Sequence, residues 1–444
     1  MTFVGVITYI KEINQAFWRW NLEHGRGVLD PAHAFFNTIF HVLVYTALAL
    51  TIFYFILSII ILLNKKTKEK DFDIKNAPFV TIQIPTRNEI IALRCAEMCL
   101  DFDYPKNKYN ILIGDDSNDK TVSKKLEEFA ALHEKVTIIH RKENTGFKPG
   151  NLNNMLKHSS GEIILIFDSD FTPEKDFLKR IVAPLVNDKT VSAVQAKWNY
   201  NNFSQNFVTI LASTIGYICH NLALTFMRKF ESGFLCGSAE AVRKKDLLNM
   251  GKWKSGSMTE DIEFSLRLYK ENKKIVYIPT LECYGDVPFK PKDLYKQQMR
   301  WAYGVISAYK EHFKGIFFNK ILTKRKKVLG SFAAFGYLLP VLIILLFLFG
   351  LLSFITDTPA PLNLAKFFSE TGKNILLTSG LIFASIISLY KARKIKYSFK
   401  MIASSFTVGL MTTFYVNKGI IKAILKKPME WYLLSKNINY SVKH

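Results

Sequence analysis

The sequence has few cysteines, and none of them are spaced as metal ligands usually are. The five cysteines, Cys95, Cys99, Cys219, Cys236 and Cys283, are odd in number and show no CxxC spacing. Their spacing therefore supports neither a zinc site nor a disulfide framework. Free cysteines of this kind are compatible with a reducing cytoplasm.

The sequence also lacks the glycine-rich loops that bind nucleotide phosphates in two common classes of enzyme. No GxGxxG and no GxxxxGK[ST] motif occurs at a strand-to-helix junction. A standard dinucleotide site and a P-loop kinase are therefore disfavoured. A nucleotide would have to be held by other groups, and carboxylates are the candidates.

Acidic residues are scarce relative to basic ones. The 444 residues include 37 Asp and Glu against 60 Lys and Arg, which gives a formal net charge of +23. Basic patches with interleaved aromatic residues are typical of nucleic-acid binding. Here much of the excess flanks long apolar segments, where each charge gains about 1 kcal/mol from anionic lipid head groups. The composition favours a lipid bilayer as the partner and argues against nucleic acid.

Charged residues are absent from one run that is long enough to cross a bilayer. Residues 40–63 contain no Lys, Arg, Asp or Glu, and about 20 such residues span the hydrocarbon as a helix. The lysines that follow predict that the next part of the chain lies in the cytoplasm. The run starts too far into the chain to be a signal peptide.

Three further apolar segments follow, at residues 331–355, 375–390 and 401–416. One span before the large polar region and three after it would place the C-terminus outside. The late lysines, however, favour a cytoplasmic C-terminus. A re-entrant or interfacial segment among the last two would reconcile these observations.

Between residues 77 and 309 short apolar runs alternate with amphipathic stretches, which predicts a parallel sheet wrapped by helices. Such sheets bind ligands at the carboxyl ends of their strands. The residues that follow the first three apolar runs are Pro85, Thr86, Arg87, Asn88, Glu89, Asp115, Asp116, His140 and Arg141.

A candidate metal site is the run Asp168-Ser169-Asp170, which follows the apolar segment IILIF. Alternation along an extended chain places the two carboxylates on one side and Ser169 on the other. Mg²⁺ or Mn²⁺ bound by such carboxylates and by substrate phosphates would neutralise a leaving diphosphate. Asp pairs are also common at surface turns, and an Asx-rich turn is the structural alternative for Ser117 to Asp119.

The run Thr259-Glu260-Asp261 opens an amphipathic pattern. Thr259 is a plausible N-cap, and acidic residues are favoured in the first turn of a helix. The functional alternative is that Asp261 accepts a proton from an acceptor hydroxyl, which requires a carboxylate aimed into a cavity.

Residues 295–302 predict an interfacial helix that contains Gln297, Arg300 and Trp301. Arg and Trp are common at membrane interfaces, which is a structural explanation for both. Because the segment shortly precedes a long apolar run, it could also cover a bound donor. Arg300 would then pair with a diphosphate, and Trp301 would offer a stacking face to an acceptor sugar.

Taken in order, these motifs resemble those of the processive family 2 glycosyltransferases. Segments similar to bacterial cellulose synthases are Lys148-Pro149-Gly150-Asn151-Leu152-Asn153 and Phe234-Leu235-Cys236-Gly237-Ser238. Segments closer to the plant-type mannan and glucomannan synthases, which are cellulose synthase-like, are Asp115-Asp116-Ser117, Val194-Gln195-Ala196-Lys197-Trp198 and Gln297-Gln298-Met299-Arg300-Trp301. Near the end, residues 430–436 resemble a gating loop over the donor, with Trp431, Ser435 and Lys436 as the matching positions.

The resemblance implies an α/β fold, in which a GT-A (Rossmann-like) domain is inserted between transmembrane helices that form a channel. It implies inverting transfer from UDP-glucose or GDP-mannose, with Mg²⁺ or Mn²⁺ as cofactor. The implied catalytic residues are Asp261, Glu260 and Thr259, and the implied metal ligands are Asp168 and Asp170. The implied nucleotide-sugar contacts are Pro85, Thr86, Arg87, Asn88, Glu89, Asp115, Asp116, Lys148, Asp168, Ser169, Gln297 and Arg300. The implied acceptor contacts are Cys236, Gly237, Ser238 and Trp301.

We therefore expect an integral, multi-pass protein of the plasma (inner) membrane with a cytoplasmic catalytic domain. The expected parts are an interfacial segment at 1–37, a transmembrane helix at 38–64 and the GT-A domain at 76–310. They continue with an interfacial segment at 311–328, transmembrane helices at 329–417 and a cytoplasmic C-terminal segment at 418–444.

The expected activity is elongation and translocation of a β-linked polysaccharide of the cellulose or mannan type. The alternative is a non-processive enzyme that makes a glycolipid on a ceramide or polyprenyl-phosphate acceptor. A third reading is an inactive membrane scaffold that keeps the fold. The sugar, the linkage, the oligomeric state and any export partner stay open at this level.

Overall fold

The computed structural model describes residues 12–13, 15–17, 19–20, 25–64, 71–141, 143–358, 364–432 and 435. The chain divides into two compact units. The first comprises Met1–Ile56 with Leu338–Phe383, and the second comprises Leu57–Tyr337 with Ala384–His444. All of the candidate site residues that the structure describes belong to the second unit.

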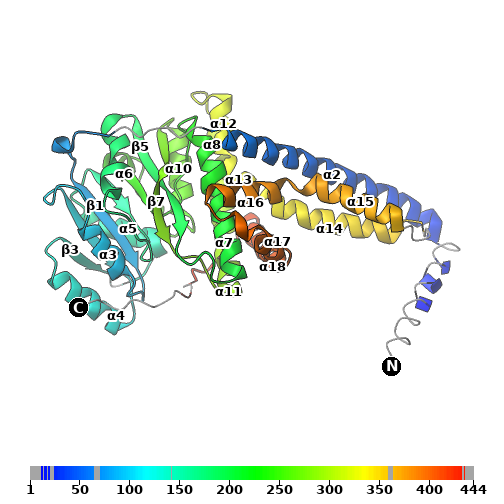
Figure 1. Cartoon of the computed structure of the whole chain (residues 1–444), viewed down its shortest axis with the longest axis horizontal. Coiled ribbons are helices and arrows are strands. Elements are labelled where there is room, and N and C mark those ends of the chain that lie inside the picture. The colour runs from blue at the N-terminus through cyan, green and yellow to red at the C-terminus, as the bar shows by residue number, and fades with distance from the viewer. Residues whose placement is uncertain are drawn as a thin grey trace. The chain divides into compact units, whose positions relative to one another are not determined.

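Seven strands of the second unit form one sheet in the order β3-β2-β1-β4-β6-β5-β7 (Figure 1). The strands are β1 Val80–Thr86, β2 Tyr109–Asp115, β3 Val136–His140, β4 Ile163–Ile166, β5 Val191–Tyr200, β6 Glu240–Arg243 and β7 Lys274–Gly285. The predicted alternation of strands and helices is confirmed.

The sheet is mixed and not parallel throughout, because β6 runs antiparallel to both β4 and β5. Glu240 at the start of β6 pairs with Ile166 at the end of β4. The chain therefore enters β6 at the edge of the sheet where β4 ends, after the helical segment at residues 207–228. Because β6 starts at this edge of the sheet, the preceding segment, residues 232–239, lies beside the acidic motifs.

Alternate residues of the central strands face two separate apolar cores. Ile163 and Leu165 of β4 belong to one core, whereas Ile164 and Ile166 belong to the other. The first core also includes residues of α3 Ala92–Leu100, α4 Lys120–Ala131 and α6 Phe177–Asn187. The second includes residues of α5 Phe147–His158, α9 Lys244–Asn249, α10 Glu260–Lys270 and α11 Pro291–Phe317. A strand buried on both faces must be apolar throughout, as β4 is.

The remaining elements of the second unit surround this sheet. They are η2 Ile74–Asn76, α7 Phe207–Tyr217, the π-helical turn η3 Ile218–Leu224, α8 Thr225–Arg228, α12 Lys324–Gly330, α13 Phe332–Phe335, η4 Ile395–Tyr397, α17 Ser398–Phe406 and α18 Val408–Ile424. Helix α18 packs along α11, where the Lys310 ammonium donates hydrogen bonds to the carbonyls of Ala423 (3.1 Å) and Ile424 (2.8 Å).

Long apolar helices dominate the first unit. They are α2 Arg26–Leu62, α14 Leu338–Thr356, α15 Leu364–Thr378 and α16 Gly380–Lys391, of which α2 and α16 continue into the second unit (Figure 1). Helix α2 contacts α14 through a 2.9 Å hydrogen bond between His33 Nδ1 and the Ser353 carbonyl. It contacts α16 through the rings of Phe55 and Phe383, whose centroids lie 4.6 Å apart.

Three helices of the described chain are long and apolar enough to cross a membrane, namely Arg26–Leu62, Phe207–Arg228 and Phe332–Thr356. A bent pair, Phe368–Thr378 with Gly380–Lys391, would be a fourth if it forms one span. The first and third overlap the expected spans at 40–63 and 331–355, and the segment at 375–390 falls in the bent pair. Residues 401–416 are divided between α17 and α18 and do not pass this test within the described residues.

The candidate span Phe207–Arg228 was not anticipated from the sequence. Its apolar window is 67% buried inside the protein, against 11% for Phe332–Thr356. Most of its apolar surface is therefore already covered by the second unit. Burial against protein explains its hydropathy without a bilayer.

Candidate active site

The polar loops after β1 and β2 meet at one edge of the sheet, as the parallel register predicts. The Thr86 carbonyl accepts a 3.0 Å hydrogen bond from the Asp116 amide, and the Asn88 amide donates to Ser117 Oγ at 2.7 Å. Asn88 has a φ of 56°, a left-handed conformation that Asn tolerates better than most residues. Its side-chain oxygen accepts from the amides of Asn118 and Asp119, which holds the β2 loop against the β1 loop.

The β1 loop also contacts the residues that follow β4. The Ser169 hydroxyl donates a short hydrogen bond to the Glu89 carboxylate. Pro85 and Thr86 are the last two residues of β1 and pair with Gly114 and Asp115, and Arg87 directly follows them. The candidate donor-binding residues after β1, β2 and β4 therefore form one contiguous surface.

Asp115 and Asp116 have well-defined partners within the protein. Asp115 accepts hydrogen bonds from the Ser117 amide (2.9 Å) and from Ser123 Oγ (2.5 Å). Asp116 receives two bonds from the Arg141 guanidinium, one of them from Nε at 2.7 Å. Both carboxylates are thus tied to fixed groups, and Asp116 lies in a largely buried ion pair.

Lys148, at the start of α5, joins three segments that are distant in sequence. Its ammonium lies 2.7 Å from Asp168 Oδ1 and 3.4 Å from Glu260 Oε1, and it donates a 2.6 Å hydrogen bond to the Gly237 carbonyl. Burial alone would lower the pKa of Lys148, but the charges of Asp168 and Glu260 outweigh this effect and raise it. Lys148 is therefore a permanent cation at the centre of the site.

Asp261 lies in the first turn of α10 and is buried beside this cluster. Burial, together with the charge of Glu260, raises the pKa of the Asp261 carboxyl from 3.8 to about 7. A carboxylate that titrates near neutral pH can take up a proton, which is the property that a general base requires.

Glycine is required at position 237, next to Asp261. Gly237 has a φ of 90°, and a Cβ built there would lie 3.3 Å from Asp261 Oδ2 and 3.4 Å from Lys148 Nζ. A side chain at this position would be strained and would crowd both groups. The Cys236-Gly237-Ser238 segment therefore approaches the candidate base through its backbone.

Two residues that the sequence did not single out hold this segment in place. The Glu240 carboxylate accepts hydrogen bonds from the amides of Gly237 (2.8 Å) and Cys236 (3.2 Å), and Gln195 Oε1 accepts from the Cys236 amide at 2.7 Å. Burial and the charge of Asp261 raise the pKa of Glu240. For Gln195 the available signal was its place in the mannan-synthase-like segment 194–198, whereas Glu240 is only the first residue of the short strand β6.

The pair Asp168 and Asp170 fits a hard cation that also takes ligands from the substrate. The Asp168 side chain is 34% exposed, and its amide donates to Ser238 Oγ at 2.8 Å. Asp170 is buried, and its Oδ2 accepts from the Asp286 amide at 3.2 Å. The described residues place no third carboxylate close enough to complete a cage with this pair. Such a site suits Mg²⁺ or Mn²⁺ held by two carboxylates and phosphate oxygens.

Arg300, on α11, is covered by an aromatic side chain from the C-terminal segment. The guanidinium lies 4.1 Å from the centroid of the Trp431 ring, and its NH1 donates to the Met258 carbonyl at 3.0 Å. Trp431 also stacks on Phe147, with centroids 5.6 Å apart and planes 20° apart. Burial lowers the pKa of Arg300, and the charges of Glu260, Asp168 and Asp261 oppose this shift.

The remaining predicted residues have less defined roles. The Ser435 amide donates to Asp293 Oδ2 at 3.1 Å, and Lys290 donates to Ser435 Oγ at 3.1 Å, which fixes this segment on the start of α11. Gln297 and Trp301 are half-buried on α11. Lys436 lies outside the described residues.

The structure places Thr259 at the expected N-cap position of α10, without a capping hydrogen bond. Its buried Oγ1 has no hydrogen-bond partner among the described residues. The Thr259 side chain instead packs where a Cβ on Gly304 would collide with it. Close contact between α10 and α11 thus takes precedence over capping.

The family model described as "Glycosyl transferase family group 2" matches residues 163–369, which include the segments that carry Asp168, Gly237, Asp261 and Arg300. The chain therefore contains a family 2 glycosyltransferase domain over the matched residues. It is a hexosyltransferase with a GT-A domain, so the resemblance that the motifs indicated is confirmed.

Two curated relatives of this glycosyltransferase differ in acceptor. It is 26% identical over 380 residues to the probable glucomannan 4-beta-mannosyltransferase 11 of Arabidopsis thaliana, a match that covers 82% of each chain. It is 29% identical over 273 residues to the beta-monoglucosyldiacylglycerol synthase of Trichormus variabilis. The second match covers 59% of this glycosyltransferase and only 56% of the relative.

Among solved structures, a mannosyltransferase from Pyrobaculum calidifontis in complex with GDP-Man and Mn²⁺ has a similar fold. The TM-score is 0.60 at 16% identity, and the match covers 90% of this glycosyltransferase and 100% of that chain. At this level of identity the similarity concerns the fold alone.

Proposed function

We propose that this glycosyltransferase transfers a hexose, with inversion, from a nucleotide-diphosphate sugar to the end of a β-linked glycan. The observation that carries the proposal is the cluster around Lys148. This one ammonium joins Asp168, Glu260 and the Gly237 carbonyl, and the buried Asp261 lies against Gly237. Donor-binding, metal-binding and acceptor-binding segments of the family thus converge on one point.

In the proposed reaction Asp261 accepts the proton of the acceptor hydroxyl. The acceptor oxygen bonds to C1 of the donor hexose as the bond between C1 and the diphosphate oxygen breaks. The nucleoside diphosphate leaves with the electron pair, and its negative charge is stabilised by Lys148 and Arg300. A single displacement of this kind inverts the anomeric configuration and needs no covalent sugar-enzyme intermediate.

A divalent cation belongs to this proposal as a cofactor. Asp168 and Asp170 would hold Mg²⁺ or Mn²⁺, which would neutralise charge on the donor diphosphate. The Asp168 carboxylate is partly exposed and is paired with the Lys148 ammonium at 2.7 Å.

A polymer is the proposed product because two acceptor-side features lie at the site. Cys236-Gly237-Ser238 adjoins Asp261, and Trp431 covers Arg300 in the manner expected of a gating segment. The similarity to a glucomannan mannosyltransferase over most of both chains supports this acceptor class. We further propose that the apolar helices hold the enzyme in the plasma membrane, with the catalytic unit on the cytoplasmic side, and carry the glycan across.

A glycolipid product is the second candidate. It is favoured by the similarity to a beta-monoglucosyldiacylglycerol synthase, a relative named for a diacylglycerol product. The reaction at C1 would be the same, with a lipid hydroxyl as the acceptor.

The deciding experiment uses the full-length enzyme in lipid vesicles with Mn²⁺ or Mg²⁺. Radiolabelled UDP-glucose and GDP-mannose are offered separately, and the product is sized and then digested with linkage-specific glycanases. A long, glycanase-sensitive product from one donor is expected. A single labelled sugar extracted with lipid would instead establish the glycolipid enzyme, and no transfer from any nucleotide sugar would reject both candidates. The Asp261→Asn variant is the inactive control.

A further inference from the structure

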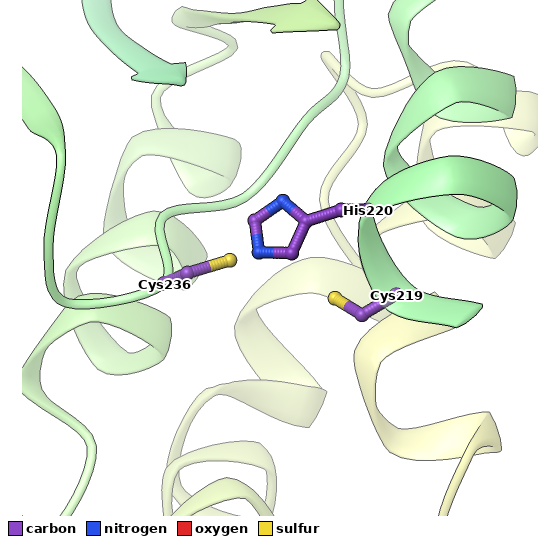
Figure 2. Close-up of side chains that lie close together, drawn as sticks. All are labelled: Cys219, His220 and Cys236. Atoms are coloured by element: carbon purple, nitrogen blue, oxygen red, sulfur yellow. The ribbon is translucent and has the colours of Figure 1, made fainter. Parts of the chain in front are cut away.

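Three potential metal ligands that are scattered in the sequence meet beside the acceptor segment. Cys219 and His220 belong to the π-helical turn η3, and Cys236 directly precedes Gly237. Their ligand atoms, the two sulfurs and one imidazole nitrogen, all lie within 4.8 Å of one another. Figure 2 shows both sulfurs on the same side of the His220 ring, with a ring nitrogen facing the sulfur of Cys236.

The imidazole of His220 is held by ring contacts and is fully buried. Its centroid lies 5.2 Å from that of Trp198 and 5.9 Å from that of Tyr277, and the residue is 1% exposed. Nδ1 is buried without a hydrogen-bond partner among the described residues. In Figure 2 the nitrogen that faces Cys236 is Nε2 and Nδ1 points away from both sulfurs, so Nε2 is the candidate ligand atom.

The two cysteines are accessible enough for an ion to reach them. Both are only partly buried, in contrast to the fully buried core cysteines Cys95, Cys99 and Cys283. In a tetrahedral site, metal–sulfur bonds of about 2.3 Å and metal–nitrogen bonds of about 2.0 Å hold the ligand atoms within about 4 Å of one another. Small side-chain rotations would therefore complete the site, because the π-helical turn already presents two adjacent residues to it.

Charged groups of both signs lie near the cluster, so the choice of ion rests on the types of ligand. The carboxylates of Asp261 and Glu240 both act electrostatically on Cys236. The positive charge of Lys197 opposes a cation at His220. The Lys197 ammonium is, however, paired with Glu282 Oε1 at 2.9 Å. Two thiolates with an imidazole suit zinc and other thiophilic ions, whereas carboxylates suit Mg²⁺ and Mn²⁺.

We propose that Cys219, His220 and Cys236 form a site for a thiophilic cation of the Zn²⁺ class. Binding replaces the proton of each thiol with a bond to the metal, so two protons are released to solvent. The bound ion links η3 to the Cys236-Gly237-Ser238 segment and leaves one coordination position open. This site is separate from the carboxylates that would hold the ion of the transfer reaction, and it does not depend on the proposed function.

The test is a Co²⁺ titration of the full-length enzyme in detergent, under a phosphine reductant and with Mg²⁺ in excess. Co²⁺ bound by thiolates gives a sulfur-to-metal charge-transfer band, which neither Mg²⁺ nor a carboxylate site produces. We expect the band to saturate at one equivalent of Co²⁺ and to disappear when one equivalent of Zn²⁺ is added. Absence of the band in the unmodified protein would overturn the proposal, whatever the variants show.

Variants locate the ligands. Cys219→Ser, Cys236→Ser and His220→Gln should each weaken Co²⁺ binding by at least about 100-fold. The matched control is Cys95→Ala, which removes a cysteine from the other core and should keep the full band. A band of equal strength and affinity in both cysteine-to-serine variants would assign the metal to other residues and refute the site.

A second readout does not require the variants to fold. Zn²⁺ should slow amide hydrogen exchange in residues 218–224 and 234–238 of the unmodified protein. Exchange in α3, which contains Cys95 and Cys99, should not change. Protection confined to other segments would contradict the proposed link between η3 and the Cys236-Gly237-Ser238 segment.

Discussion

The carboxylates that follow β2 and those that follow β4 look alike in the sequence, but their surroundings differ. Asp116 receives two bonds from the Arg141 guanidinium, and Asp115 accepts from the Ser117 amide of its own loop and from the Ser123 hydroxyl of α4. After β4, Asp168 instead shares the ammonium of Lys148 with Glu260, which comes from α10.

This difference separates a structural role from a chemical one. A carboxylate whose oxygens are occupied by fixed partners holds a loop in place, and it gains little from a new cation. Carboxylates that share one ammonium leave oxygens available. Burial, together with the charge of Glu260, raises the pKa of Asp261 to about 7. Nucleotide contacts by Asp115 and Asp116 stay a prediction. These contacts would be made by a loop whose conformation is already fixed by hydrogen bonds within the protein.

The largest expected effect is that of Asp261→Asn. Loss of the base should lower the rate of sugar transfer by about 10² to 10⁴-fold. Thermal stability above pH 7 should be equal or higher, because the amide does not carry a desolvated charge. Initial rates and melting curves measure the two effects, and Asp115→Asn serves as the comparison from the β2 loop. Near-normal transfer by a folded Asp261→Asn protein would show that the base is another group.

Lys148→Met tests the ammonium that pairs with Asp168, after β4, and with Glu260. Loss of its charge should lower kcat by about 10² to 10³-fold, because the leaving diphosphate loses an electrostatic partner. Lys148→Arg keeps the charge and should recover part of the rate. An unchanged kcat in the methionine variant, measured at saturating donor, would reduce Lys148 to a structural role.

Arg141→Met tests the β2 side and should act on stability rather than on chemistry. Removal of one partner from a largely buried ion pair leaves an uncompensated charge and should cost about 3 kcal/mol in free energy of unfolding. The double variant Arg141→Met with Asp116→Asn removes both charges and should recover part of this loss. If chemical denaturation shows no loss in the single variant, the ion pair is not structural.

The pH dependence of transfer should reflect Asp261. Its pKa is raised in the folded protein, and only the ionised form accepts a proton, so the rate should fall about tenfold per pH unit below about 7. Stability should change in the opposite sense. Between pH 4 and 7 the folded state binds this proton more tightly than the unfolded state, so the contribution of Asp261 to stability decreases as the pH rises. A rate profile that is flat down to pH 5 would contradict the assignment.

The smallest expected effect is that of Trp431→Ala. A cation–π contact of about 0.5 to 2 kcal/mol orders Arg300, so the KM for the donor should rise about 2- to 30-fold with kcat less affected. Tyr432→Ala is the matched control, because that ring lies over Lys296 and not over Arg300. Equal changes in both variants would mean that the C-terminal segment acts as a whole and not through Trp431.

Much of the catalytic unit could be predicted because its signals are local. The apolar runs of β1, β2, β3 and β4 end at the predicted positions, and polar residues follow them, since a buried strand is largely apolar and stops where the sequence becomes polar. The antiparallel direction of β6 could not be predicted. Four residues of strand pattern carry no information about direction, which is set by where the chain enters the sheet.

The partners of the site residues could also not be predicted from the sequence. Nothing in the order of residues indicates that Lys148 is shared between Asp168 and Glu260, or that Glu240 and Gln195 hold the Cys236-Gly237-Ser238 segment. These contacts connect positions up to 112 residues apart along the chain, as between Lys148 and Glu260. The cysteine spacing in the sequence argued against a metal site. The fold nevertheless brings Cys219 and Cys236 into one cluster of potential metal ligands.

The sequence by itself determined the family, the apolar helices and the chemical types of residue at the strand ends, because periodicity, hydropathy and motif order are properties of neighbouring residues. The tertiary structure alone decided which carboxylates are occupied by fixed partners, which one is buried enough to titrate near neutral pH, and where soft ligands meet. Those properties depend on desolvation and on distances between side chains, and both are set only when separate segments pack together.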